Sequence, residues 1–574
     1  MNKKCYSLLS VITFLWCGLI GQACANVQMQ TPTQFTHFVN ANGYTLNTKG
    51  ELVRFTEFVV KDDLIQSVGK AIRSTESSVK IDLAGKTVLP GLIDAHGHIL
   101  GLGAYLLEVD LRGASSEQEA VSRVLQFIGK QSVHANIHKR DNSIAKDTRW
   151  IVGDGWNQVL WPSKSFPSKA SLDKAMPNVP VILSRVDGHA VWVNSKALEL
   201  AGIDRNTPSP SGGEIVKDEN GEPTGLLIDN AEDLVQKVVP QPTLEDLEEH
   251  LEVATNHLLE LGITSAHDAG ISKKVRDFYI DKAEKNELNF RIYAMLAATD
   301  PAILDLLKAG HYYDNNGFLS IRSVKAYGDG ALGSRGAALL APYSDDPTNS
   351  GLLLTPQERL PSLFNTILGA NFQLNFHAIG DRANRLALLQ FNDSFKIFPE
   401  NTKRHRIEHA QVVAVEDIPL FKEYGVIPSM QPTHATSDMN MAEDRIGKAR
   451  LKGAYAWQTY LKQGSRIALG SDFPVELANV FHGLHAAVSR QNASQEPAQG
   501  WIASESLDRI QAFKGFTIDA AYAAFQEDMI GSIEAGKKAD FIVIDKDYFE
   551  VPTKEIRDIQ VLSTYVNGKQ VFTK

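Results

Sequence analysis

The chain has 574 residues, of which 43% are hydrophobic and 22% are charged, a composition typical of globular proteins that excludes a disordered or fibrous chain. Its length predicts two or three domains. The formal net charge is -10 with no basic stripe, which argues against nucleic acid as a partner. No internal run reaches the roughly 18 apolar residues that a membrane-spanning helix needs.

The first 25 residues have the pattern of a secretory signal peptide. Lys3 and Lys4 are followed by an apolar run over residues 6–20 and by small residues at 23 and 25. The alternative is an uncleaved membrane anchor. We therefore expect a periplasmic or secreted protein that has no contact with the membrane after cleavage at Ala25.

Cysteine is confined to this segment, at Cys5, Cys17 and Cys24. Cleavage would leave a chain with no cysteine, and the loss of two lysines would change its net charge from -10 to -12. Disulfides, thiolate metal sites and a cysteine nucleophile are then excluded. Any metal would have to be held by nitrogen and oxygen ligands.

Both ends of the remaining chain are rich in strand-forming residues. Residues 33–88 contain short β-like runs, and residues 531–574 contain another set that Asn567 and Gly568 break with a hairpin-type turn. We predict that the two ends form one small β-sandwich domain, with a large domain over residues 89–530 inserted between them.

The middle of the chain alternates short apolar runs with helical patterns, which predicts a parallel sheet in an α/β fold. The distances from His267 to Leu296 and from Leu296 to Lys325 are both 29 residues, close to the roughly 31 residues of one βα unit in a (β/α)₈ TIM barrel. The expected strands lie near residues 90–95, 262–267, 289–296, 319–326, 372–377, 405–409, 425–430 and 466–471. The interval between the first two strands predicts an insertion over about residues 105–242, which could cap the mouth of the barrel.

Polar side chains recur where these strands end. His96 and His98 are two residues apart at the end of the first strand, so both imidazoles lie on one side of it. His377, His409 and Asp472 end the fifth, sixth and eighth strands. Barrel enzymes keep their chemistry at this end of the strands. A bound metal would compensate the cost of burying so many polar groups, although each histidine taken alone is compatible with a structural role.

These motifs carry a resemblance to the amidohydrolase superfamily, in particular to amidohydrolase family 3, which includes N-substituted formamide deformylase and D-aminoacylase-like enzymes. The similar segments are LPGLIDAHGH at 89–98, HAIGD at 377–381, EHA at 408–410, GSDFP at 470–474 and GSIEAGKKAD at 531–540, with GDGW at 153–156 and GHAVWVNS at 188–195 in the insertion. The resemblance implies a metal-dependent amidohydrolase that cleaves the C–N bond of an amide, N-acyl or N-formyl compound other than a peptide.

The resemblance also implies roles for individual residues. His96 and His98 would bind one metal, and His377 and His409 would bind a second or complete a site for one ion. Lys325, at the end of the fourth strand, would bridge the metals as a carbamate; the alternative is a lysine with its head group in water. Asp472 would be both a metal ligand and the general base. Zinc suits these ligands, and iron, manganese or cobalt are alternatives.

Five further residues are candidates for contacts with a small-molecule substrate. Arg335 follows the glycine-rich segment that begins at Gly328 and suits a substrate carboxylate, unless it is an ordinary surface arginine. Trp156 and His189 belong to the insertion, and His267 and His434 follow the second and seventh strands. A homo-oligomer is a further possibility.

Three other functions are alternatives to this interpretation. A metal-dependent isomerase or deaminase uses the same barrel, but the only acid near His377 is Asp381, where related deaminases carry a glutamate. A non-catalytic regulatory or binding protein would have lost ligands that this chain retains. A serine hydrolase is disfavoured because the sequence has no Gly-x-Ser-x-Gly motif.

Overall fold

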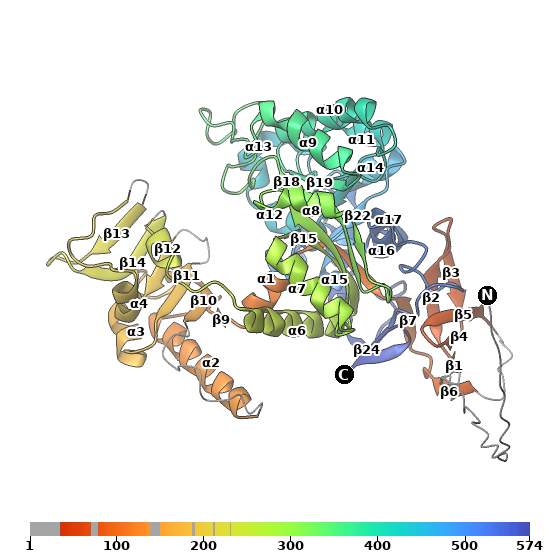
Figure 1. Cartoon of the computed structure of the whole chain (residues 1–574), viewed down its shortest axis with the longest axis horizontal. Helices are drawn as coiled ribbons and strands as arrows, with labels where there is room; N and C mark the ends of the chain where they lie inside the picture. The colour runs from red at the N-terminus through yellow and green to blue at the C-terminus, as the bar shows by residue number, and fades with distance from the viewer. Residues whose placement is uncertain (1–34, 71–77, 138–149, 186–189, 211–212, 230) are drawn as a thin grey trace, which may run out of the picture.

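The structure is a computed structural model that describes residues 35–70, 78–137, 150–185, 190–210, 213–229 and 231–574. The expected signal peptide lies outside the described residues. A β-sandwich, a central barrel and a separate lobe follow one another across the molecule (Figure 1). In the part of the chain that the structure describes, no helix is long and apolar enough to cross a membrane.

The β-sandwich is built from both ends of the chain. One sheet has the order β5-β4-β1-β6 and the other the order β25-β24-β23-β7-β2-β3, so β7 lies between an N-terminal and a C-terminal strand. The rings of Phe38, Phe58 and Phe541 pack together in the core, with centroids 4.7–5.0 Å apart. The strands are β1 (Phe35–Val39), β2 (Asn42–Leu46), β3 (Leu52–Phe55), β4 (Glu57–Lys61), β5 (Leu64–Gly69), β6 (Ser78–Asp82), β7 (Thr87–Pro90), β23 (Phe541–Ile544), β24 (Val561–Val566) and β25 (Lys569–Thr573).

Eight parallel strands form the barrel in chain order, which confirms the predicted fold class. They are β8 (Leu92–Gly97), β15 (Ile263–Ile271), β16 (Arg291–Ala297), β18 (Leu319–Tyr327), β19 (Gln373–Ala378), β20 (Arg406–His409), β21 (Ile427–Met430) and β22 (Ala468–Leu469), with the short β17 (Tyr312–Tyr313) antiparallel to β18. The first and last strands meet just beyond β22, where the Asp472 amide donates to the His96 carbonyl at 2.7 Å and the His98 amide donates to the Phe473 carbonyl at 2.8 Å. The barrel therefore closes at its C-terminal end, next to the predicted metal ligands.

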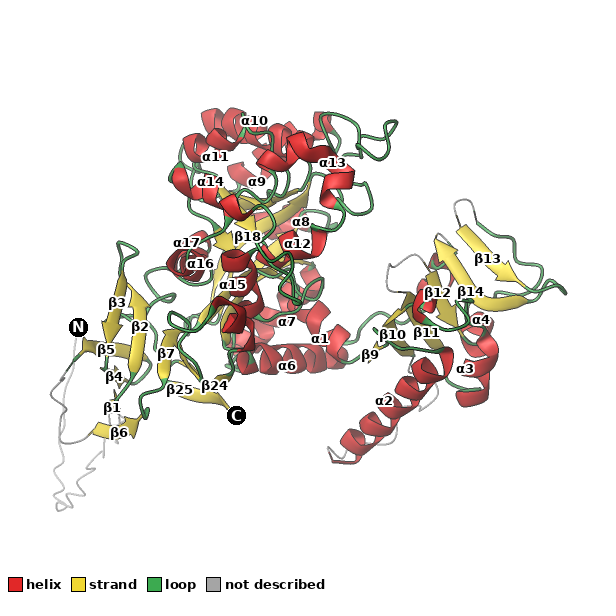
Figure 2. Cartoon of the chain, turned by 180° about the vertical axis from the view of Figure 1, so that it is seen from behind, coloured by secondary structure: helices red, strands yellow, loops and turns green. Residues whose placement is uncertain are grey.

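Helices surround the barrel (Figure 2). Their apolar faces pack on the strands; α6, for example, begins with a capping box at Thr243 and buries Leu251 and Leu258. The helices are α1 (Ile99–Leu106), α6 (Leu244–Glu260), α7 (Lys273–Glu284), α8 (Ile303–Ala309), α9 (Leu360–Gly369), α10 (Asp381–Ile397), α11 (Ile418–Tyr424), α12 (Pro432–Asp438), α13 (Ala442–Arg450), α14 (Trp457–Lys462), α15 (Val480–Ser489), α16 (Arg509–Gly515) and α17 (Ile518–Ala523), with 3₁₀ turns η2 (Gln357–Arg359), η3 (Leu451–Gly453), η4 (Ala503–Glu505) and η5 (Thr553–Asp558).

A buried ion pair joins the barrel to the β-sandwich. Arg291, the first residue of β16, donates to both carboxylate oxygens of Asp540 at 2.6 and 2.9 Å and to Asn567 Oδ1 at 2.6 Å. These contacts lie where the barrel strands begin. The β-sandwich therefore supports the end of the barrel opposite the predicted site.

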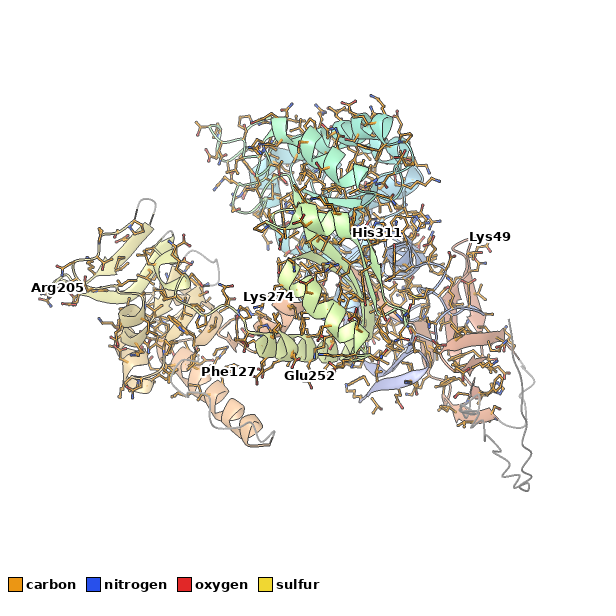
Figure 3. All side chains as sticks on the ribbon, in the orientation of Figure 1. Lys49, Phe127, Arg205, Glu252, Lys274 and His311 are labelled. Carbon is orange, nitrogen blue, oxygen red and sulfur yellow. The ribbon has the colours of Figure 1, made fainter. Side chains whose placement is uncertain are left out.

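The insertion between α1 and α6 is a separate lobe with its own sheet, ordered β13-β14-β12-β11-β10-β9. It stands apart from the barrel, on the side away from the β-sandwich (Figures 1 and 2), and Arg205 marks its outer end (Figure 3). The lobe therefore lies on the same side of the barrel as the predicted site but stands apart from the barrel, whereas the sequence indicated an insertion that could cap its mouth. Its elements are β9 (Val109–Asp110), α2 (Glu117–Ile137), β10 (Ile151–Trp156), η1 (Gln158–Leu160), α3 (Lys169–Ala175), β11 (Val181–Arg185), β12 (Ala190–Val193), α4 (Ser195–Leu200), β13 (Gly213–Lys217), β14 (Pro223–Asp229) and α5 (Asp233–Gln236).

Candidate metal centre

The six predicted metal ligands gather at the C-terminal end of the barrel, because parallel strands bring their carboxyl ends to one edge. His98 Nε2 lies 3.2 Å and His96 Nε2 3.6 Å from Asp472 Oδ1. Lys325 Nζ donates to His96 Nε2 at 3.1 Å. The His409 ring lies 4.9 Å from that of His96 and 4.5 Å from that of His377, measured between centroids. These six residues are His96, His98, Lys325, His377, His409 and Asp472.

The cluster is buried, with one open side. His96, Lys325 and His409 are at most 5% exposed, whereas the side chain of His98 is 35% exposed. His98 also caps α1 at the point where the chain leaves the barrel. A small molecule would therefore reach the cluster past His98.

Unusual backbone conformations occur at two of these residues. His409 has φ +74° and Asp472 has φ +65°, in the left-handed region that residues other than glycine seldom adopt. Close contacts hold the chain there: a Cβ on Gly97 would lie 2.4 Å from the Phe473 ring, and one on Gly470 would lie 2.6 Å from the His96 amide nitrogen. The surrounding residues thus fix the approach of Asp472 to His96 and His98.

Asp94 ties the first and last strands together. It is fully buried and accepts hydrogen bonds from the amide and hydroxyl of Ser471 and from the amide of His96. Burial raises the pKa of Asp94 to about 7. These bonds hold the segment that carries Asp472 against the strand that carries His96.

Glu408, which the sequence indicated only as part of the EHA motif, orients a predicted ligand. Its carboxylate accepts a hydrogen bond from His96 Nδ1 and pairs with the Arg406 guanidinium at 2.7 Å, and all three side chains are fully buried. Because a carboxylate only accepts, Nδ1 of His96 carries the proton and Nε2 keeps its lone pair for the cluster. The only sign of this role in the sequence is that Glu408 is a glutamate at the end of an otherwise apolar strand. Strand alternation would put Glu408 and His409 on opposite sides, but the left-handed conformation at His409 lets both contact His96.

His409 is oriented in the same way. Its Nδ1 donates to Gln431 Oε1 at 2.9 Å, and Gln431 is placed by a hydrogen bond from its Nε2 to the Ser429 carbonyl. Nε2 of His409 is thereby left free of a proton. Gln431, which follows the seventh strand, was not singled out from the sequence.

The electrostatics of the cluster suit a cation. Burial, with the positive charge of Lys325, lowers the pKa of His96 to about 4 and that of His377 to about 3, so both imidazoles are neutral at pH 7. Burial alone would raise the pKa of Asp472, but the neighbouring imidazoles of His96 and His98 outweigh it and keep the carboxylate ionised. Burial also lowers the pKa of Lys325 to about 8. Neutral imidazoles and an ionised carboxylate are the forms that ligate a metal.

Unpartnered atoms provide a second indication that the residues fit a metal. Nε2 of His377 and Nε2 of His434 are buried and have no hydrogen-bond partner among the described residues. Such atoms are costly in a folded protein unless something binds them. Among the described residues, two groups place one ligand atom from each member within 4.8 Å of the others: His96, His98 and Asp472, and His409, His434 and Asp472.

The five predicted substrate-binding residues take different places. His434 Nε2 lies 3.7 Å from Asp472 Oδ2, within the cluster. His267 is fully buried inside the barrel, where its Nδ1 accepts from Arg406 at 2.9 Å. Arg335 pairs with Asp345 at 2.9 Å, so a carboxylate of the protein already holds its guanidinium. His189 lies outside the described residues.

Trp156 does not line the barrel mouth. It is fully buried in the hydrophobic core of the insertion, near Trp161 and Trp192, and its indole NH donates to the Leu183 carbonyl at 2.8 Å. Its size and its single donor are both used inside the lobe. In this structure Trp156 therefore stabilises the insertion and does not contact the cluster.

A (β/α)₈ barrel with buried imidazoles and a carboxylate at its strand ends defines a class of metal-dependent hydrolases. Comparison with known families makes this specific: residues 80–572 match the model of the Amidohydrolase family, and the chain belongs to that family. The chain is a metal-dependent hydrolase of the amidohydrolase superfamily.

Relatives span nearly the whole chain. A putative amidohydrolase, YtcJ, of Bacillus subtilis is 32% identical over 92% of this chain and 98% of its own length. N-substituted formamide deformylase of Arthrobacter pascens is 25% identical over 92% of this chain and 97% of its own length. The crystal structure of an uncharacterized metal-dependent hydrolase from Pyrococcus furiosus is also similar, with 28% identity, a TM-score of 0.73, and coverage of 90% of this chain and 100% of that one.

Proposed function

We propose that the protein hydrolyses the C–N bond of an amide, N-acyl or N-formyl compound other than a peptide, with zinc as its metal. The observation that carries this proposal is the convergence of the Asp472 carboxylate with the imidazoles of His98 and His96, whose Nε2 atoms lie 3.2 and 3.6 Å from Asp472 Oδ1 at the end of the first barrel strand. The similarity to a formamide deformylase supports the choice of bond.

The ligands would be His96, His98, His377 and His409 with Asp472, for one or two ions. When bound, zinc lowers the pKa of a coordinated water to about 7 and polarises the carbonyl of the substrate. Asp472 then acts as the general base: its carboxylate accepts a proton from the attacking water and returns that proton to the nitrogen of the leaving amine. Glu408 keeps His96 Nε2 turned toward the site throughout.

Lys325 would take part as a carbamate. The neutral amine attacks CO₂, a nitrogen–carbon bond forms, and one proton leaves the nitrogen for solvent. Burial of Lys325 supports this step, because a pKa lowered to about 8 makes the neutral amine more accessible near pH 7 than it is in water. The product is a carbamate with anionic oxygens. A group that could ligate a metal would then stand beside His96 in place of the Lys325 ammonium.

The setting of the reaction is also proposed. The N-terminal pattern supports a periplasmic or secreted enzyme. The net negative charge argues against nucleic acid and leaves a small molecule as the proposed substrate. A homo-oligomer is compatible with the free-standing insertion. Cell fractionation, with the N-terminus of the exported protein sequenced, tests the location. Recovery of uncleaved protein in the membrane would contradict it.

The reaction is tested with the zinc-loaded protein and a panel of formamides, N-acyl amino acids and cyclic amides. Asp472→Asn should reduce kcat on any accepted substrate by about 10²- to 10⁴-fold, the range of a general base. The matched control is Asp519→Asn, because Asp519 is a buried carboxylate on α17 that lies 3.4 Å from Arg466, outside the metal cluster. Full activity of Asp472→Asn on every substrate found would exclude the assignment of the base.

A further inference from the structure

One histidine of the cluster is absent from the ligand set proposed above, and it follows the seventh strand of the barrel. His434 lies on α12, directly after β21, and its Nε2 is buried without a hydrogen-bond partner among the described residues. The side chain as a whole is 13% exposed. A buried imidazole nitrogen with no partner is an unfavourable arrangement unless another group occupies the space that it faces.

The carboxylate of Asp472 faces two groups of histidines at once. Its Oδ1 is turned toward His96 and His98, and its Oδ2 is turned toward His434 at 3.7 Å. That distance is too long for a hydrogen bond. It is close to the separation of about 3.3 Å that two ligands adopt around a tetrahedral ion when each lies about 2.0–2.1 Å from it.

His409 completes this second group. Its ring is nearly parallel to that of His434, with centroids 5.9 Å apart, and its Nδ1–H is engaged by Gln431, so its Nε2 is the nitrogen available for coordination. The ligand atoms of His409, His434 and Asp472 lie within 4.8 Å of one another. His377, a ligand in the set proposed above, is a member of neither group of three; its ring lies 4.5 Å from that of His409, and its Nε2 lies 3.6 Å from Asp329 Oδ1.

We propose that His434 is a metal ligand, which binds an ion together with His409 and the Oδ2 atom of Asp472, while Asp472 Oδ1 serves the ion held by His96 and His98. Asp472 thus bridges two coordination sites. This inference rests on the metal-dependent function proposed above and deepens it, since it assigns a ligand from the seventh strand and a bridging role to the carboxylate.

Metal binding, measured independently of activity, tests the assignment. The full-length protein is stripped with a chelator and reloaded with Co²⁺ or Zn²⁺, the metal per chain is determined by mass spectrometry, and affinities are measured by competition with a chelating dye. His434→Gln should weaken one ion by about 100-fold or more, because loss of a residue that merely orients a ligand already costs roughly 10- to 100-fold. The visible absorption of the Co²⁺ protein should decrease in parallel.

Two comparisons make the test specific. His409→Gln should weaken the same ion, and the His409→Gln, His434→Gln double variant should lose no more than that one ion. The control is His311→Gln, since His311 lies on the outside of the barrel (Figure 3), where its Nε2 donates to the Asn371 carbonyl at 3.0 Å. The metal-free variants should melt at the temperature of the metal-free wild type.

A His434→Gln variant with the stoichiometry, affinity and Co²⁺ spectrum of the wild type would overturn the inference, whether the wild type holds one ion or two. The two proposals fail in different ways. A wild type that hydrolyses its substrate while His434→Gln binds metal normally refutes only the role of His434. A wild-type protein that binds neither Co²⁺ nor Zn²⁺ refutes the metal-dependent reaction as well.

Discussion

Replacement of Glu408 by glutamine tests how the barrel prepares its ligands. The carboxylate lies between His96 Nδ1 and the Arg406 guanidinium, and all three residues are fully buried. The Arg406 guanidinium also contacts the Ala95 carbonyl and the Ser429 hydroxyl, but Glu408 is the carboxylate that it pairs with there. Glutamine keeps the size of the side chain and one accepting oxygen, and removes the negative charge.

Two effects follow from the geometry. Breaking a buried ion pair by removing one partner costs about 3–5 kcal/mol, and the amide oxygen that remains to accept one hydrogen bond places the loss in the free energy of unfolding near the lower limit, about 3 kcal/mol. The affinity for metal at His96 should fall by roughly 10- to 100-fold, since the orienting partner of a ligand is weakened. That loss equals about 1.4–2.7 kcal/mol.

The assay combines urea unfolding of the metal-free protein with dye competition for Zn²⁺. The matched control is Glu416→Gln, because Glu416 is 71% exposed in its ion pair with Arg385 at 2.7 Å, and solvent screens such exposed pairs so that they contribute little to stability. A Glu408→Gln protein that is as stable and binds metal as tightly as the control would show that Glu408 neither balances Arg406 nor orients His96.

Three further predictions concern other parts of the molecule. Burial lowers the pKa of His405 to about 4, below its usual 6.5, so protonation favours the unfolded chain; between pH 7.5 and 4 the metal-free wild type should lose about 3 kcal/mol in urea unfolding that His405→Gln does not lose. Asp540→Asn should lower the free energy of unfolding by about 3 kcal/mol, because Arg291 loses its buried counter-charge, and calorimetry should show a lower melting temperature. Trp156→Ala should destabilise the insertion by about 3–5 kcal/mol and increase hydrogen exchange in β10 and β11, with metal content unchanged. An unchanged pH profile, melting temperature or exchange pattern, respectively, would contradict each.

The barrel could be predicted from sequence because its constraints are local and repeated. Each strand was expected as a short apolar run, several of them ending at or next to a polar residue, and the strand expected near residues 319–326 is β18 (Leu319–Tyr327) in the structure. The eighth strand is the least regular: only Ala468–Leu469 pair as a strand, because the chain turns at Asp472 to reach the first strand. Strand periodicity carries no information about that turn.

The cluster was predictable to the extent that ligands end strands. Glu408 and Gln431 orient His96 and His409 by accepting a hydrogen bond from Nδ1 of each ring. This role depends on side-chain directions that are set only when the strands are assembled. Arg335 shows the reverse case, since its partner Asp345 is 10 residues along the same loop and no sequence pattern joins them. The insertion was predicted from the long interval between the first two strands and from two motifs that lie in it. Its apolar side chains are buried in two hydrophobic cores of its own, so it does not need to pack against the barrel to bury them.

The cost of the cluster argues that a cation belongs to its folded state. Neutral imidazoles, an ionised carboxylate and a lysine whose pKa is lowered to about 8 are all buried together, and the left-handed backbone at His409 and Asp472 adds strain. A core of apolar residues at the same strand ends would be more stable. The chain instead closes its barrel at Asp472 and His96, so the hydrogen bonds that complete the fold also set the distances between the ligands. Binding of a metal would recover stability at the very atoms that the barrel leaves without partners.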